Sequence, residues 1–236
     1  MEETIHINVE LHKSDTHYIS ITKTRLWSQI LISLNWLIKA PIARTVSIQN
    51  GLGLMIINNL AILIEGFISD LITEHLDNNE LVKPKEIKGL DKNGWSHKKE
   101  LYNKTFQKDL ESYAEYKSIE SLFFLRNNIS HGKTHNEINK THIISGQKTI
   151  IESVDKNYQK VRKYLVEKKV ITEKDTSSNV DVLWKLQIAF FFFSESKKFL
   201  FAVIQTNESN KKQAILSELQ SSLSVPAESP EGDSAQ

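Results

Sequence analysis

The residues of this chain best suited to chemistry stand close together in the segment 121–135, SLFFLRNNISHGKTH. At 100° per residue, four apolar residues fall within about 60° of Arg126 on a helix, namely Ile119, Leu122, Phe123 and Ile129. Arg126 therefore lies in the middle of an apolar face. An unpaired guanidinium there is costly, so Arg126 needs either a buried carboxylate or an anionic ligand in a cleft.

Two further polar residues follow Arg126 on the same predicted helix. Asn127 and His131 are four positions apart, so they lie one above the other on one side. Gly132 is a natural left-handed C-cap and is expected to end the helix near Ser130 or His131. A histidine at that end feels the negative pole of the helix dipole, which favours its protonated form. Arg126, Asn127 and His131 could then converge on one phosphate.

The segment Arg126–Gly132, RNNISHG, resembles the signature of the HEPN superfamily, the higher-eukaryote and prokaryote nucleotide-binding domain, in which Arg and a polar residue precede His-Gly by a few positions. The apolar, acidic stretch Ala61–Leu71 is similar to an early helix of many members. The resemblance covers about residues 45–210. It implies an all-α, HEPN-like helical bundle and a homodimer whose two motifs lie side by side. It also implies a metal-independent endoribonuclease, acting as a toxin or phage-defence effector, with an antitoxin or regulatory protein as a further partner.

The resemblance also implies a catalytic role for each residue. His131 would act as general base or acid while a ribose 2′-OH attacks the adjacent phosphodiester. Arg126 would stabilise the negative charge that develops on the phosphate oxygens, and Asn127 would orient the histidine or the phosphate. Glu65 is a supporting residue, expected to pair with Arg126 across two helices rather than to act as a catalytic acid.

The formal net charge of +1 conceals a basic middle of the chain. Residues 81–108 contain eight Lys against three acidic residues, and residues 148–174 contain eight Lys or Arg against four. A strand of RNA would need such an excess around the motif, although charge runs are often only solvated faces. Lys98, Lys99 and Lys133 are the predicted RNA contacts.

Other interpretations of the same residues remain open or fail. Arg126 could form a purely structural buried pair with Glu65 or Asp70. A non-catalytic HEPN-like module that binds a nucleotide or a protein is the alternative function. By contrast, the sequence Gly132-Lys-Thr lacks the earlier glycine of a phosphate-binding P-loop, because position 127 is Asn. His131 and His135 do not form a helical metal pair, since Gly132 interrupts the helix between them.

The elements that must position the motif are mostly helices. With only 8 Gly and 4 Pro, the chain favours long helices over a turn-rich β architecture. Alternating apolar residues predict a small β-hairpin over residues 1–23 and a second short hairpin near 142–151. About six helices are predicted within a helical domain of residues 24–210, over 24–40, 52–76, 95–113, 118–130, 152–167 and 180–206. The composition of residues 211–236 predicts a mostly disordered acidic tail.

Composition excludes several classes of site. With 0 Cys among 236 residues, the chain has no disulfide, thiolate nucleophile or zinc ribbon, and a cytoplasmic setting is the simplest expectation. The apolar stretches 51–72 and 180–204 contain several charged or amide side chains, so we expect buried helices and no membrane association. We expect neither a cofactor nor a metal ion.

Overall fold

The computed structural model describes most of the helical part of the chain and four strands. The described residues are 3–10, 16–23, 25–39, 46–78, 90, 94–130, 140–144, 147–152, 156–173, 183, 185–207 and 212–224. Its helices are α1 (Leu26–Lys39), α2 (Val46–Asn78), α4 (Trp95–Phe106), the 3₁₀ helix η1 (Leu110–Ser112), α5 (Tyr116–Ser130), α6 (Lys156–Glu167), α7 (Leu186–Thr206) and α8 (Lys212–Ser224). The body of the molecule is all-α, as predicted from the sequence.

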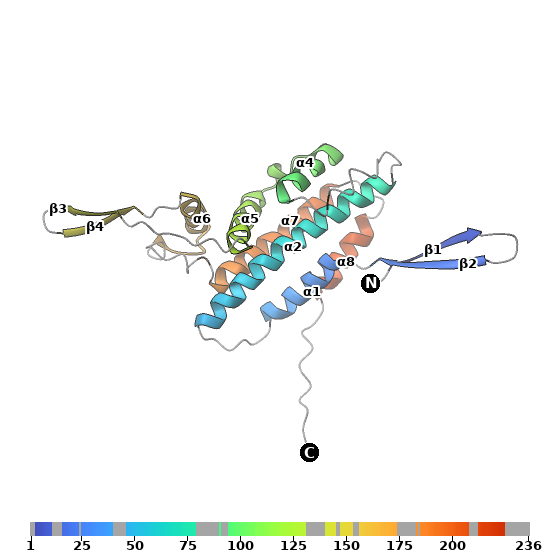
Figure 1. Cartoon of the computed structure of the whole chain (residues 1–236), viewed down its shortest axis with the longest axis horizontal. Helices are drawn as coiled ribbons and strands as arrows, with labels where there is room; N and C mark the ends of the chain where they lie inside the picture. The colour runs from blue at the N-terminus through green and yellow to red at the C-terminus, as the bar shows by residue number, and fades with distance from the viewer. Residues whose placement is uncertain are drawn as a thin grey trace, which may run out of the picture.

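Helix α2 forms the centre of the bundle. It packs against α7, α1, α5 and α4, and runs along the bundle in Figure 1. Because it is apolar nearly all round, it can bury residues towards several neighbours at once. Its buried apolar side chains are Ile56, Ile57, Leu60, Ala61, Leu63, Ile64, Phe67, Ile68, Leu71 and Ile72. α2 thus provides the fixed surface on which α5 is placed.

The segment that leads into α5 differs from the single helix predicted over 95–113. α4 ends because Gln107 takes up a left-handed conformation, with φ 50° and ψ 35°. The Asp109 side chain then accepts a hydrogen bond from the backbone N–H of Glu111 and begins η1. The Asn103 side chain ties the corner together by donating to Asp109 and accepting from the backbone N–H of Leu110. The chain therefore turns sharply before α5 begins.

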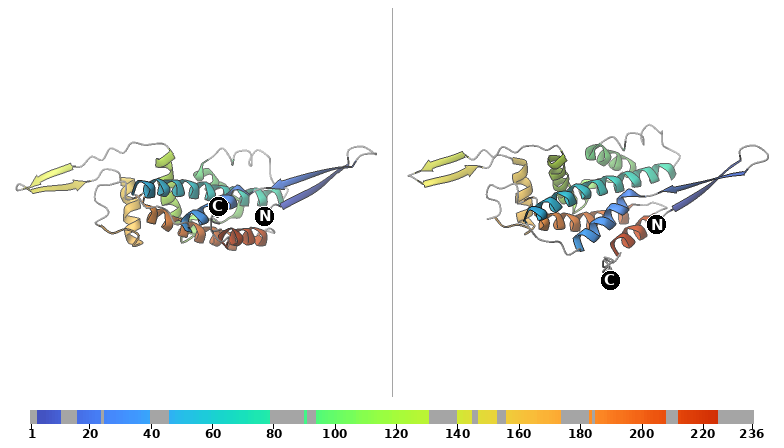
Figure 2. Two further views of the ribbon diagram at one scale, coloured as in Figure 1. Left: turned by 90° about the horizontal axis from the view of Figure 1, so that it is seen from below. Right: turned by 60° about the horizontal axis from the view of Figure 1, so that its bottom comes forward.

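Two antiparallel hairpins lie outside the helical body (Figure 2). In the first, β1 (Glu3–Glu10) pairs with β2 (Thr16–Lys23), and Ile5 lies opposite Ile21. In the second, β3 (Lys140–Ile144) pairs with β4 (Gln147–Glu152). Because β4 continues to Glu152, α6 begins at Lys156, four residues later than the predicted start.

The prediction of a disordered tail over residues 211–236 is wrong for its first half. Residues 212–224 form α8, which packs against α1 and α7. Ile215 and Leu219 are buried one turn apart, and the Asn35 side chain on α1 donates to the backbone carbonyl of Leu223 across 2.9 Å. Burial of this apolar stripe stabilises α8, although the composition of the segment is typical of a disordered tail. Residues 225–236 lie outside the described residues.

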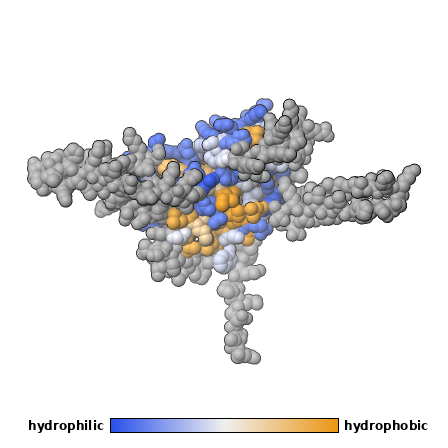
Figure 3. Space-filling model, viewed as in Figure 1, coloured by the Kyte–Doolittle hydropathy of each residue, from blue (hydrophilic) through white to orange (hydrophobic). Residues whose placement is uncertain are grey.

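Part of the apolar surface remains exposed on α1 and α2. Within the described residues, one helical stretch, Gly51–Leu76 in α2, is long and apolar enough to span a membrane, and half of its most apolar window is buried in the molecule. Figure 3 shows apolar surface near the centre of the face seen in Figure 1. The large apolar side chains that are most exposed are Leu26, Trp36, Met55 and Ile62.

Candidate functional site

The predicted pairing of Arg126 with Glu65 is present in the structure. Arg126 lies near the end of α5, where this helix packs against α2, and its Nη2 donates a hydrogen bond to Oε1 of Glu65. The two side chains are 20% and 17% exposed, so the pair lies at the edge of the core. Asp70, the other predicted partner, instead accepts a hydrogen bond from the Trp27 indole and lies 3.9 Å from Arg25.

Arg126 also lies against a pair of stacked aromatic rings. The Arg126 guanidinium carbon lies 5.3 Å from the centre of the Phe123 ring, within range of a cation–π contact. The Phe123 ring is stacked on Trp95 of α4, with centroids 4.3 Å apart and an interplanar angle of 10°. Arg126 therefore contacts Glu65 of α2 and Phe123 of its own helix, and Trp95 of α4 supports the Phe123 ring.

Arg126 retains hydrogen-bonding capacity beyond the pair. A guanidinium has five N–H donors in a fixed fork. Among the described residues, Arg126 makes one hydrogen bond, through Nη2, while its buried Nε has no partner. A site with donors left over and partial exposure can accept an anionic oxygen, which is what a phosphate would supply.

The other motif residues are only partly described. Asn127 is exposed, and the neighbouring Asn128 donates its side-chain amide to the Phe124 carbonyl across 2.7 Å. α5 ends at Ser130, close to the end predicted from Gly132. His131 and Gly132 lie outside the described residues.

The lysines predicted to contact RNA differ in burial and in their pairing with other groups. Lys98 on α4 is buried, with 7% of its surface exposed, so it does not present a cation to the surface. Lys99 donates to Glu111 across 2.5 Å and lies over the Tyr116 ring, and its pKa is raised by the Glu111 hydrogen bond. Lys133 lies outside the described residues. The RNA contacts predicted on α4 are therefore buried or already paired.

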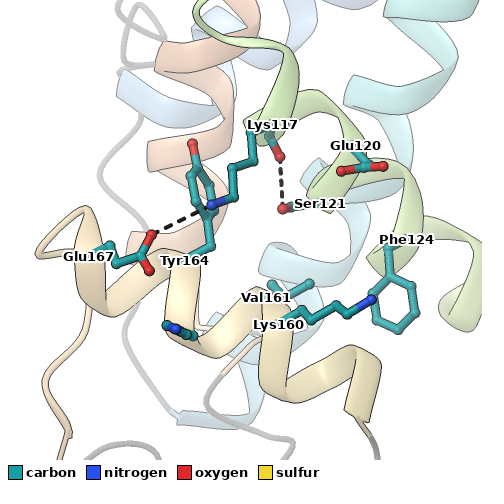
Figure 4. A pocket seen from close by; sticks show the side chains of 9 residues that line it. Lys117, Glu120, Ser121, Phe124, Lys160, Val161, Tyr164 and Glu167 are labelled. Carbon is teal, nitrogen blue, oxygen red and sulfur yellow. Dashed lines mark hydrogen bonds and ion pairs between the residues drawn. The ribbon is translucent and has the colours of Figure 1, made fainter. Parts of the chain in front are cut away.

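A pocket between α5 and α6 carries other cations, which sequence reasoning did not single out (Figure 4). Its volume is about 450 Å³, and it is lined by Lys117, Glu120, Ser121 and Phe124 of α5 and by Lys160, Val161, Lys163, Tyr164 and Glu167 of α6. The lysines of α6 belong to the basic run 148–174, which was the signal available in the sequence. The run is long, and only the packing of α6 on α5 shows which of its cations face a cavity.

One wall of this pocket is a fixed hydrogen-bonded unit. Tyr164 forms a hydrogen bond with the Ser118 hydroxyl, which also donates to Glu195 of α7 across 3.1 Å. Burial raises the pKa of the Tyr164 hydroxyl more than the Ser118 hydrogen bond lowers it, so this group stays neutral at physiological pH. Lys117 lies 5.0 Å above the Tyr164 ring and 3.5 Å from Glu167.

The described residues hold no group of three or more His, Asp or Glu side chains arranged to bind a metal ion. Comparisons of the chain with protein-family models, curated proteins and solved structures gave no match. The functional conclusion therefore depends on the site residues themselves.

Proposed function

We propose that this protein is a metal-independent endoribonuclease of the HEPN type. The 2′-oxygen of a ribose attacks the adjacent phosphorus, and the bond from phosphorus to the 5′-oxygen of the next nucleotide breaks. The products are a 2′,3′-cyclic phosphate, which can open to a 3′-phosphate, and a 5′-hydroxyl. His131 takes up the proton of the 2′-OH or protonates the leaving oxygen. Arg126 stabilises the charge on the phosphate, and Asn127 orients the phosphate or the histidine.

The observation that carries this proposal is the state of Arg126. It lies five residues before His131 and is partly exposed, and within the described part of the chain one hydrogen bond, from Nη2 to Glu65, leaves its Nη1 donors available. An arginine that served only to join α5 to α2 would be expected to use more of its donors within the protein. The setting that we propose is a cytoplasmic toxin or phage-defence effector that acts as a homodimer, and mass measurement by light scattering tests the dimer.

RNA cleavage in excess chelator is the primary test. Incubation of the full chain with a labelled RNA in EDTA should give fragments with cyclic phosphate or 3′-phosphate ends. His131→Ala should slow cleavage at least 100-fold, because the proton transfer loses its acid or base. His97→Ala is the matched control, since His97 is an exposed histidine on α4 that is not part of the motif. Equal cleavage by the wild type and His131→Ala would contradict the proposal.

The alternative function, a non-catalytic module that binds a nucleotide or a protein, gives a different result. Such a module would bind RNA or nucleotide without producing fragments, and expression of the wild type would be no more toxic than expression of His131→Ala. If the protein is the proposed nuclease, cells that express His131→Ala should grow normally, whereas cells that express His97→Ala should grow as poorly as those that express the wild type.

A further inference from the structure

The pocket between α5 and α6 leads along one face of α5 towards the motif. Glu120, Phe124 and Asn127 are spaced i, i+4 and i+7, so they lie within about 60° of one another around the helix. Glu120 and Phe124 line the pocket, and Asn127 is exposed one turn beyond them. A chain-like ligand in the pocket could therefore continue along α5 to Asn127, which follows Arg126 in the sequence and lies about 100° from it around the helix.

The lining combines cations with an exposed aromatic edge. Lys160 and Lys163 are exposed on α6, and neither forms an ion pair within the described part of the chain. Figure 4 shows Lys160 extended from α6 towards the Phe124 ring on α5. Phe124 is only partly buried, and it packs against Tyr158, with the ring centroids 5.2 Å apart at 80°. The ring is thus held in place while part of it borders the pocket.

We propose that this pocket is a subsite for one nucleotide of single-stranded RNA, next to the nucleotide whose phosphate is cleaved. This assignment rests on the proposed function. The base lies against Phe124, and a backbone phosphate lies between Lys160 and Lys163. Proteins that bind single strands use this combination of aromatic platforms and cationic side chains. The volume of about 450 Å³ lies within the range of pockets that hold small ligands.

The carboxylates of the pocket determine on which side of it the phosphate would bind. Glu167 lies 3.5 Å from Lys117, so a cation already stands beside this carboxylate. Glu120 has no such partner among the described residues and would repel a phosphate placed beside it. The phosphate therefore lies on the α6 side, and Glu120 is left to accept a hydrogen bond from a ribose hydroxyl or a base amine.

Equilibrium binding to a non-cleavable RNA tests the subsite separately from the reaction. The probe is a fluorescent single-stranded RNA in which every ribose is 2′-O-methylated, so no 2′-OH can attack. The double variant Lys160→Gln/Lys163→Gln should raise the Kd about tenfold at low salt. Each lysine that contacts a phosphate should also reduce the slope of log Kd against log salt by about 0.7. The matched control is Lys39→Gln/Lys169→Gln, which removes two exposed charges from outside the pocket lining.

A conservative variant tests the aromatic contact. Phe124→Leu keeps an apolar side chain against Tyr158, and its melting temperature reports whether the fold is retained. Loss of the stacked base should weaken binding of the same probe about fivefold or more, with the salt slope unchanged, because no charge is removed. Unchanged affinity in a folded Phe124→Leu protein would overturn the base position.

The outcomes separate the subsite from the catalytic proposal. Suppose that the wild type and the control bind the probe equally well and that the Lys160/Lys163 variant binds it more weakly. The subsite is then supported, even if no RNA is cleaved. If the wild type cleaves RNA and the Lys160/Lys163 variant binds and cleaves like the control, the subsite is overturned and the nuclease stands. If the wild type binds no RNA at all, both are overturned.

Discussion

Two arginines in this bundle lie next to carboxylates on α2, and they are held in different ways. Arg25, at the start of α1, is 6% exposed and donates from one nitrogen to Glu74 of α2 across 2.6 Å and from another to Glu218 of α8 across 2.5 Å. Arg126 is 20% exposed and donates from one nitrogen to one carboxylate, Glu65. Arg25 thus joins three helices through two of its nitrogens, whereas within the described residues Arg126 joins two helices through one.

The difference shows how a structural arginine can be distinguished from one that is available to a ligand. Burial acts to lower the pKa of Arg25, but the hydrogen bonds and charges of Glu74 and Glu218 outweigh it, and the pKa is raised overall. A buried guanidinium with two carboxylates has its charge fully compensated. Among the described residues Arg126 donates to one carboxylate through one nitrogen and is partly exposed, so a phosphate could accept hydrogen bonds from its remaining donors.

The largest effect on stability is expected at Arg25. Arg25→Met keeps the length of the side chain but leaves Glu74 and Glu218 buried without their cation. Removal of one partner from a buried ion pair costs about 3–5 kcal/mol of unfolding free energy. Urea denaturation followed by circular dichroism measures this loss. A loss below about 1 kcal/mol would mean that Arg25 does not stabilise the packing of α8, and that Arg25 and Arg126 do not differ in structural role as described.

A smaller effect is expected when Glu65 loses its charge. Glu65→Gln retains a side-chain oxygen that can accept from Arg126, so the unfolding free energy should change by at most about 1 kcal/mol. Cleavage should stay within about tenfold of the wild-type rate, because Arg126 remains positioned. A loss of more than 100-fold in kcat, with the fold intact, would instead show that Glu65 takes part in proton transfer.

The smallest effect is expected at Lys197 of α7, a partly buried cation that forms no ion pair in the described part of the chain. Burial lowers its pKa, and the charge of Lys39 lowers it further. The folded state therefore disfavours the charged form, and Lys197→Met should stabilise the protein by up to about 1 kcal/mol at neutral pH. The stability advantage of Lys197→Met should shrink as pH rises from the lowered folded-state pKa of Lys197 towards the unfolded value of 10.5. Above that range Lys197 of the wild type is uncharged in both the folded and the unfolded state, so the cost of burying its charge is gone. Melting curves at several pH values measure this difference, and an advantage that grows with pH would contradict it.

Sequence reasoning located the Arg126 site because its signals are local. Helical periodicity placed one arginine on an otherwise apolar face of α5, and two carboxylates of the apolar α2, Glu65 and Asp70, were the candidate partners. A charge surrounded by apolar residues requires a partner, so a carboxylate on α2 could be predicted, and the packing of α5 on α2 shows that it is Glu65.

The Arg25 cluster and the α5–α6 pocket could not be predicted in this way. Glu218 is separated from Arg25 by 193 positions in the sequence, and it belongs to α8, which tail-like composition concealed. Lys160 and Lys163 are two of many basic residues in their run, and nothing local distinguishes a cation that faces a cavity from one on an open surface. Contacts of this kind arise from the packing of distant helices, which periodicity does not specify.

The contrast between the two arginines is tested most directly by measuring cleavage and stability together in Arg126→Gln. If Arg126 serves the reaction, the single-turnover rate of RNA cleavage in EDTA should fall about 10²–10³-fold. The unfolding free energy should fall by only about 1–2 kcal/mol, the cost of leaving the partly buried Glu65 without its donor. A variant that cleaves RNA at the wild-type rate but loses as much stability as Arg25→Met would show that Arg126, like Arg25, only holds helices together.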